Sequence, residues 1–157
     1  MCMDRVHHTD GLVKTIDLWP KEWSVSLEVK FSNTVNSWTN ILHFTTGSNN
    51  FTYGSRIPAI FVKPNSRKLQ ICGAVNNEWN WNKVTDELDA DKWIKIKISQ
   101  YLEKGTDKYR FAVAVDSAVL VNTINEAPAR FRNVKAYAPD PWNTAADVQI
   151  RNLDVGK

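Results

Sequence analysis

The chain is poor in residues that crosslink a fold or ligate metals. Its 157 residues include two cysteines, Cys2 and Cys72, and three histidines, His7, His8 and His43. So few cysteines exclude a disulfide-rich scaffold and a cysteine-based metal cluster. A Cys2–Cys72 disulfide would require the first strand to run beside the strand that carries Cys72; two unpaired thiols are the alternative.

Long runs of apolar residues and of like charges are also absent. No stretch of about 18 apolar residues occurs, so the sequence predicts no membrane span. The 20 basic and 17 acidic residues are interspersed, and the net charge is only +3. This argues against a nucleic-acid partner, because proteins that bind nucleic acids carry concentrated basic patches. Residues 1–11 are polar and lack the apolar core of a signal peptide. The chain is therefore either cytosolic or a module of a larger secreted protein.

What the sequence does have is a period of two residues, the pattern of a strand with one buried face. Segment 23–31, WSVSLEVKF, places apolar side chains at alternate positions, and segments 93–99 and 109–115 repeat the alternation. Shorter strands are predicted at 12–16, 39–45, 57–62, 68–74, 118–124, 134–138 and 148–155.

Turn-forming residues separate these strands, at 47–50, 64–66, 104–107 and 139–141. No segment has a convincing amphipathic helical pattern. About ten strands at this spacing predict an all-β fold, a two-sheet antiparallel β-sandwich. The length fits one domain over residues 1–157, with residues 1–10 as an N-terminal tail. An immunoglobulin sandwich is disfavoured because the chain is long for one and lacks its paired cysteines with an intervening tryptophan.

Five segments, taken in order, resemble a known family. They are WTNILHF at 38–44, YGSRIPAIF at 53–61, WIKIKISQ at 93–100, FRNVKAYAPDPW at 131–142 and IRNL at 150–153. Over residues 12–155 the chain resembles the concanavalin A-like lectin/glucanase (laminin-G-like) modules of animal extracellular multidomain proteins. The resemblance implies a concanavalin-like jelly roll and an extracellular role in adhesion or recognition. It defines no ligand, because the superfamily includes lectins, protein-binding modules and glycosidases.

The acidic residues do not form the pair that a glycosidase needs. A retaining enzyme holds two carboxylates about 5 Å apart, which a strand with acidic residues at positions i and i+4 would supply. The acidic cluster at 86–91 lies instead in a predicted turn, and Glu28 is alone on its strand. We therefore expect a non-catalytic module and keep a divergent polysaccharide-degrading enzyme as the less favoured alternative.

The segment 76–82, NNEWNWN, is the strongest candidate for ligand binding. Sugars stack their apolar C–H faces on aromatic rings and exchange hydrogen bonds with amides. In an extended segment Trp79 and Trp81 would share one face and the amides the other. The candidate residues are Asn77, Trp79, Asn80, Trp81 and Asn82. The alternative is a loop or edge strand whose tryptophans cap the core.

Two further loops carry candidate ligand-binding residues. Tyr53 and Arg56 flank a Gly-Ser pair, and Arg56 is suited to a carboxylate or sulfate of an acidic glycan; the alternative is an arginine bonded to loop carbonyls or stacked on Tyr53. Asp140 and Trp142 lie in a stiff Pro-Asp-Pro-Trp turn. Asp140 is a candidate calcium ligand, although calcium needs six to eight oxygens; the alternative is a packed corner. Metal binding stays open.

Four other tryptophans, Trp19, Trp23, Trp38 and Trp93, are expected in the core because they begin strands or lie on apolar faces. The function that the sequence favours is a lectin-like module that binds a glycan or glycoprotein. The alternative is a protein-interaction or self-assembly module whose tryptophan-rich surface contacts another chain.

Overall fold

The computed structural model describes residues 2–3 and 11–156, which form strands, turns and loops without a helix. The strands are β1 (Cys2–Met3), β2 (Leu12–Trp19), β3 (Trp23–Phe31), β4 (Thr39–Thr45), β5 (Ala59–Val62), β6 (Leu69–Val75), β7 (Glu78–Val84), β8 (Trp93–Leu102), β9 (Tyr109–Val115), β10 (Ala118–Asn125), β11 (Phe131–Tyr137), β12 (Thr144–Ala145) and β13 (Val148–Gly156). The predicted all-β class is confirmed. Of the predicted tail at 1–10, only β1 is described; the rest lies outside the described residues.

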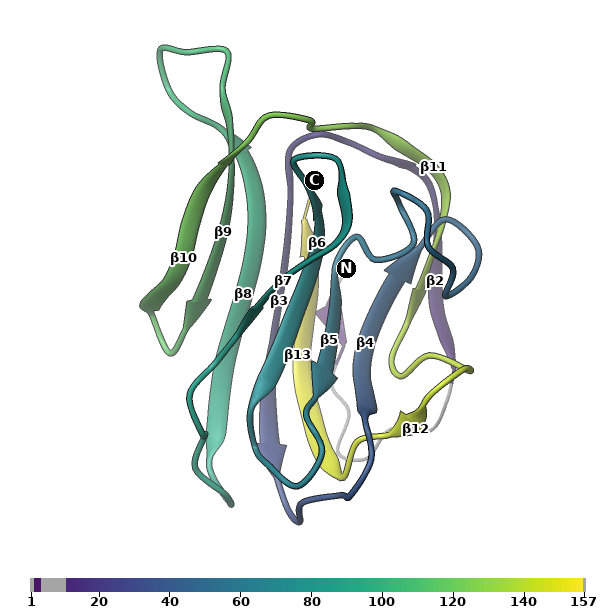
Figure 1. Ribbon diagram of the computed structural model, residues 1–157, viewed down its shortest axis with the longest axis vertical. Helices are drawn as coiled ribbons and strands as arrows, with labels where there is room; N and C mark the ends of the chain where they lie inside the picture. The colour runs from purple at the N-terminus through teal and green to yellow at the C-terminus, as the bar shows by residue number, and fades with distance from the viewer. Residues whose placement is uncertain (1, 4–10, 157) are drawn as a thin grey trace.

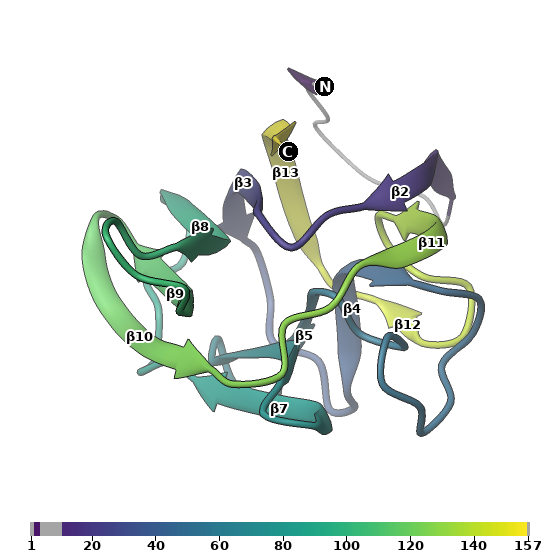
Figure 2. The ribbon, with the colours of Figure 1, turned by 90° about the horizontal axis from the view of Figure 1, so that it is seen from above.

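The strands form two sheets that pack into a sandwich (Figures 1 and 2). One sheet has the order β1-β13-β3-β8-β9-β10, and the other has the order β2-β11-β4-β5-β6-β7. The short β12 pairs in parallel with β4, and the other pairings within the sheets are antiparallel. In Figure 2, strands β3, β8 and β13 lie on one side of the molecule and β4, β5 and β7 on the other. The predicted two-sheet sandwich is therefore confirmed.

The period-two pattern explains the core. Residues at alternate positions of β3 are buried, and their partners on β8 are isoleucines: Val25 pairs with Ile98, and Val29 with Ile94. Such cross-strand pairs of branched side chains stabilise a sheet and present one apolar face to the other sheet. Trp19 is fully buried, with its ring centroid 5.3 Å from that of Trp23, so the prediction for these two tryptophans is confirmed.

Trp93 departs from the expectation of a core position. Its ring is partly exposed at the beginning of β8 and lies under the guanidinium of Arg151, at 4.0 Å from the ring centroid. Lys30, its partner on β3, places Nζ 5.7 Å from the same centroid. The Trp93 ring therefore makes cation–π contacts with two basic side chains on the surface of the sheet.

Segment 76–82 forms a hairpin turn and most of β7, the edge strand of its sheet. Asn76 and Asn77 adopt φ values of 55° and 64°, as a two-residue turn of type I′ requires. The turn is tied to the other sheet by Asn125 of β10, whose amide nitrogen donates to the Ala74 carbonyl at 3.0 Å and whose Oδ1 accepts from the Asn76 backbone N–H at 3.0 Å. The asparagines before β7 thus have a structural role.

A register shift in β4 determines which side chains leave the core. Asn40 pairs with Phe61, but Leu42 pairs with Ile60, so β4 has one extra residue between them. Such a β-bulge reverses the alternation of the strand. As a result Asn40 and His43, three residues apart, both project away from the core. The Asn40 amide spans the bulge and donates to the carbonyls of Leu42 and Ile60 at 3.1 and 3.2 Å.

The Cys2–Cys72 disulfide is not formed. Cys72 is a buried free thiol on β6, and β6 lies in the opposite sheet from β1. Burial raises the pKa of this thiol, against smaller opposing effects of Gln70 and Arg56. The thiol therefore behaves as a small apolar side chain between its neighbours.

Candidate functional site

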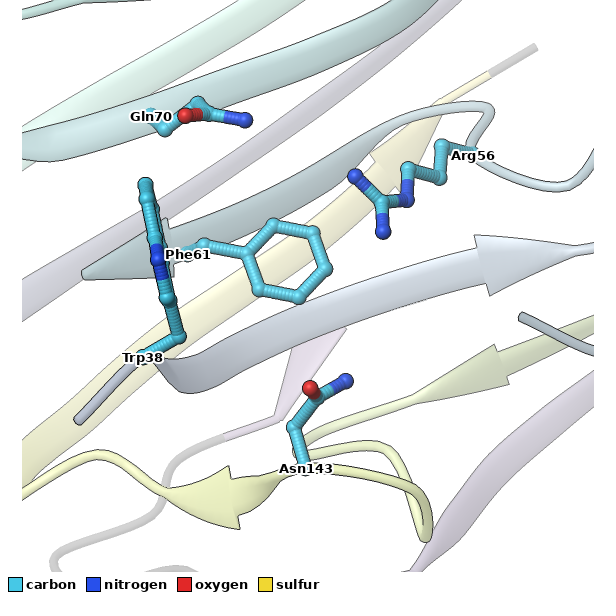
Figure 3. A pocket seen from close by; sticks show the side chains of 5 residues that line it. All are labelled: Trp38, Arg56, Phe61, Gln70 and Asn143. Atoms are coloured by element: carbon cyan, nitrogen blue, oxygen red, sulfur yellow. The ribbon is translucent and has the colours of Figure 1, made fainter. Parts of the chain in front are cut away.

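A pocket of about 270 Å³ opens on the side of the β2-β11-β4-β5-β6-β7 sheet that faces away from the core, which we call the outer face (Figure 3). Trp38, Arg56, Phe61, Gln70 and Asn143 line it. Phe61 on β5 and Gln70 on β6 are register partners. The other three come from loops: Trp38 immediately precedes β4, Arg56 precedes β5 and Asn143 precedes β12.

Arg56 is the most constrained of these residues. Its Nε and Nη2 donate to Oδ1 of Asn49 at 3.4 and 3.0 Å, and its Nη1 donates to Oδ1 of Asn80 at 2.7 Å. The guanidinium carbon lies 4.6 Å from the ring centroid of Phe61 and 5.2 Å from that of Trp79. The sequence suggested loop carbonyls or the Tyr53 ring as the alternative partners of Arg56. In the structure its partners are side-chain amides and the rings of Phe61 and Trp79.

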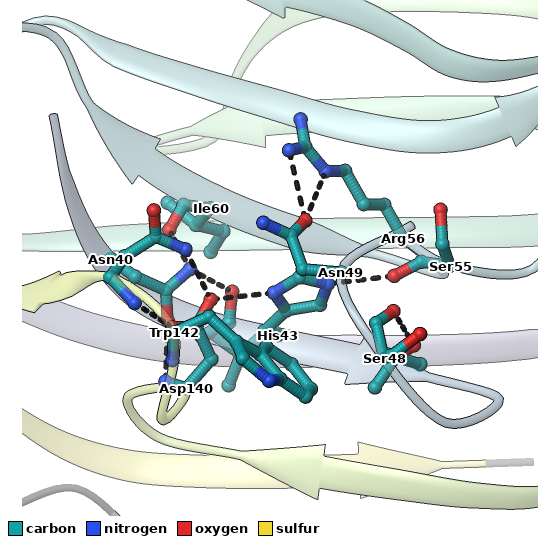
Figure 4. Close-up of polar contacts among 12 residues, drawn as sticks. Asn40, His43, Ser48, Asn49, Ser55, Arg56, Ile60, Asp140 and Trp142 are labelled. Atoms are coloured by element: carbon teal, nitrogen blue, oxygen red, sulfur yellow. Dashed lines mark hydrogen bonds and ion pairs between the residues drawn. The ribbon is translucent and has the colours of Figure 1, made fainter. Parts of the chain in front are cut away.

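The loop that carries Asn143 is held by a buried pair of titratable residues (Figure 4). Nδ1 of His43 lies 2.7 Å from Oδ2 of Asp140, and Nε2 of His43 lies 2.7 Å from the carbonyl oxygen of Ser55. The Asp140 carboxylate and the Ser55 carbonyl each present an oxygen to one ring nitrogen of His43. His43 thereby joins the loop after β11 to the loop that positions Arg56.

Asp140 is a structural carboxylate in this arrangement. Its Oδ1 accepts from the backbone N–H groups of Trp142 and Asn143, and its Oδ2 accepts from His43 and from the side-chain amide of Asn143. Burial alone would raise the pKa of Asp140, but the hydrogen bonds from His43 and Asn143 outweigh it and hold the pKa below its ordinary value.

This environment disfavours the suggested calcium site at Asp140. The side chain is buried and each carboxylate oxygen already accepts two hydrogen bonds. Asp147, the next carboxylate along the chain, accepts a hydrogen bond from the side-chain amide of Asn33 at 3.3 Å. Within the described residues no three His, Cys, Asp or Glu side chains are grouped so that they could hold a metal ion. The packed-corner alternative describes Asp140 better.

The two tryptophans of segment 76–82 do not share a ligand-facing surface, which corrects the sequence expectation. Trp81 packs against the core, with its ring centroid 5.2 Å from that of Phe111. Trp79 lies against Arg56 and against the exposed Phe51, whose ring centroid is 5.0 Å away. Gly73, the β6 partner of Trp81, leaves room for the Phe111 ring beneath the strand. Trp79 can therefore contribute to the outer face, and Trp81 contributes to the core.

The asparagines of this segment also separate. Asn80 binds Arg56, as described above. Asn82 is exposed, and its amide donates to the Asn80 carbonyl at 2.9 Å. Asn77 is exposed in the hairpin turn. Of the three, only Asn80 contacts a residue that lines the pocket.

Tyr53 and Trp142 take different places. The Tyr53 hydroxyl donates to the Ala127 carbonyl at 2.8 Å, and its ring lies against Phe131, so Tyr53 has a packing role. Burial raises the pKa of its hydroxyl. Trp142 is 41% exposed, and its ring packs edge-on against His43 and Tyr137. Trp142 does not line the pocket itself, but the next residue, Asn143, does.

Trp38 shows where sequence reasoning missed the site. It was expected in the core, yet it is 42% exposed and stands at the pocket opposite Arg56 (Figure 3). The neighbouring polar residues Asn36 and Asn40 were a signal that this position differs from the other tryptophans. Gln70 was also detectable, because alternation with the buried Leu69 and Ile71 places it on the opposite face of β6.

These features define the class of fold: a concanavalin-like jelly roll, with a polar and aromatic pocket on one sheet. Solved structures similar to the chain include a pentraxin from Limulus polyphemus (TM-score 0.60, 11% identity, 98% of this chain and 74% of the other). Sheep galectin-11 is similar over 95% of this chain and 98% of its own (TM-score 0.55, 10% identity). The predicted resemblance to the concanavalin-like fold is thus confirmed.

A third similar structure is a sialidase of Trypanosoma rangeli in complex with sialic acid, with a TM-score of 0.66 and 9% identity. The match covers 99% of this chain but only 30% of the sialidase. No family model matches the chain, and no curated protein matches it. The part of the chain that the structure describes contains no helix long and apolar enough to cross a membrane.

Proposed function

We propose that the chain is a non-catalytic carbohydrate-binding module and that it binds a glycan in the outer-face pocket. The observation that carries the proposal is the composition of this pocket. An exposed indole, Trp38, stands over a cavity whose other walls carry a guanidinium and two carboxamides. A pyranose presents an apolar face and a rim of hydroxyl groups, which these two kinds of side chain complement.

The fold supports this proposal without specifying a sugar. The similar structures include a pentraxin and a galectin, and one is a sialidase in complex with sialic acid. A non-catalytic role is favoured because the five described residues that line the pocket include no carboxylate. The neighbouring Asp140 is committed to four hydrogen bonds and is poorly placed to act as an acid or base. We further propose that the module acts outside the cell, as the family resemblance implies.

A glycan array followed by titration calorimetry tests this function. We expect at least one glycan to bind the wild-type protein, and Trp38→Ala to weaken that binding by at least about fivefold, since one aromatic contact contributes about 1 kcal/mol. The matched control is Tyr101→Ala. Tyr101 has a similar exposure but lies on β8 of the other sheet, so this variant should bind normally.

Three outcomes would contradict the proposal in different ways. Binding that survives Trp38→Ala but is lost in Tyr101→Ala would place the site on the opposite sheet. A blank array with working positive controls would reject carbohydrate binding. It would favour the alternative of a protein-interaction or self-assembly module, and light scattering at increasing protein concentration would then test self-association. Turnover of a polysaccharide would overturn the non-catalytic role.

A further inference from the structure

The cation in the pocket, Arg56, has no anionic partner among the described residues. Arg56 donates hydrogen bonds to the Oδ1 atoms of Asn49 and Asn80, which are neutral amides, and its guanidinium lies over the rings of Phe61 and Trp79. The ion pairs among the described residues involve Lys92, Arg110 and Arg151, and the Asp140 carboxylate lies against His43. The positive charge of Arg56 therefore lacks a carboxylate partner within the part of the chain that the structure describes.

The hydrogen bonds of the guanidinium leave a donor for a ligand. A guanidinium has five N–H groups. Asn49 accepts from Nε and from one N–H of Nη2, while Nη1 donates to Asn80 and lies 4.0 Å from the Cys72 sulfur. The second N–H of Nη2 has no acceptor among the described residues. Figure 3 shows the group directed towards the pocket from the side of Phe61 opposite Trp38.

The surroundings of the pocket do not cancel this charge. Gln70 and Asn143, the other polar lining residues, are neutral. Asp140 lies next to the Asn143 loop, but its carboxylate is enclosed by His43, Asn143 and backbone N–H groups. The guanidinium lies over the rings of Phe61 and Trp79 and is half-buried, and a hydrogen bond from a partly buried cation to an anion is stronger than one in bulk water.

We infer that the pocket selects a glycan that carries an anionic group, a uronate carboxylate or a sulfate ester, and that Arg56 binds this group while Trp38 packs against the ring. The inference rests on the proposed carbohydrate-binding function and adds the chemical class of the sugar. Gln70 and Asn143 are placed to bind the neighbouring hydroxyl groups.

Matched oligosaccharide pairs test the inference on the wild-type protein. A hyaluronan tetrasaccharide and its carboxyl-reduced form differ only in the carboxylates, and a sulfated galactan tetrasaccharide and its desulfated form differ only in the sulfates. In calorimetry we expect one acidic member to bind at least about tenfold more tightly than its neutral counterpart, since hydrogen bonds to charged groups are the strong ones. The pair that shows the difference identifies the anion.

Variants then assign the effect to Arg56. Arg56→Gln should abolish the preference for the acidic member, and Arg56→Lys, which keeps the charge but not the planar fork, should restore it in part. The charge control is Lys97→Gln, an exposed lysine on β8 of the other sheet, which should leave the preference unchanged. Thermal melts verify folding. Should Arg56→Gln fail to fold, the oligosaccharide pairs still decide the question.

The outcomes separate this inference from the proposed function. Equal binding of acidic and neutral members would overturn the inference and leave carbohydrate binding intact. A preference that is lost in Lys97→Gln and retained in Arg56→Gln would also overturn it. Binding of none of the four tetrasaccharides, with a blank glycan array, would overturn both.

Discussion

Asp140 and His43, 97 residues apart in the sequence, form a buried pair at 2.7 Å that fastens the loop after β11 to β4. We expect Asp140→Asn to lower the free energy of unfolding by about 3 kcal/mol, because it disrupts a buried carboxylate that accepts four hydrogen bonds and leaves buried donors without their acceptor. Urea denaturation measures the change. The control is Asp89→Asn, which removes an exposed pair with Lys92 and should cost less than about 1 kcal/mol. Equal losses in the two variants would contradict the structural role of Asp140.

The lowered pKa of Asp140 predicts a loss of stability in acid. Because its folded-state pKa lies below the ordinary value of 3.8, the carboxylate contributes stability that is complete above that value and is lost as the pH falls through the folded-state pKa. Glu28 acts in the same direction, since hydrogen bonds from Asn152 and then Arg151 lower its pKa below 4.5.

Urea denaturation between about pH 5 and pH 2 checks this dependence. The wild-type protein should lose stability steadily over that range, and Asp140→Asn should show a shallower slope because its titrating group is gone. A slope that Asp140→Asn leaves unchanged would assign the acid sensitivity to other carboxylates.

Gly73 predicts a strong local penalty for one added carbon. A Cβ at this position would lie 2.7 Å from two ring atoms of Phe111, which is buried and cannot easily move. We expect Gly73→Ala to destabilise the protein by about 1–3 kcal/mol through overpacking. Gly47→Ala is the matched control, because nothing lies within 4 Å of its Cβ position, and it should change stability by less than about 0.5 kcal/mol. Thermal denaturation of the two variants gives the comparison.

The separation of the two β7 tryptophans predicts different phenotypes. Trp81→Ala should destabilise the protein by about 2–3 kcal/mol, because it removes the contact with Phe111 and leaves a cavity. Trp79→Ala should cost about 1 kcal/mol, the value of a partly exposed contact with a cation. Denaturation measures the first effect, and ligand titration should show that only Trp79→Ala weakens binding beyond its effect on folding. The reverse pattern would restore the outer-face position expected for Trp81.

Much of the fold was predictable because strand alternation is local. Segments 23–31, 39–45 and 109–115 coincide with β3, β4 and β9. The first and third alternate apolar and other residues, and the second has apolar residues at its centre. β7 was harder to recognise. It is an edge strand whose exposed residues include Asn82 and Lys83, so its composition resembles that of a loop.

The site was predictable only in part, because its geometry depends on contacts that no local pattern contains. Arg56 was recognised, but its partner Asn49 comes from the loop after β4 and its partner Asn80 comes from β7. The bulge in β4 places Asn40 and His43 on one face, where strict alternation would separate them. Trp38 was assigned to the core because an indole beside an apolar strand is usually buried, and only the pairing of β4 with β5 shows that it lies at the pocket.

The enclosure of Arg56 has a consequence for the thermodynamics of recognition. An arginine side chain that is free in solution loses conformational entropy when a ligand immobilises it, at a cost of about 0.5–1.5 kcal/mol. Here two amide oxygens and two aromatic rings already restrict the guanidinium in the unliganded protein. Most of that ordering takes place during folding, so the pocket is preorganised. A ligand that reaches Arg56 should meet a rigid donor and bind with little adjustment of the protein.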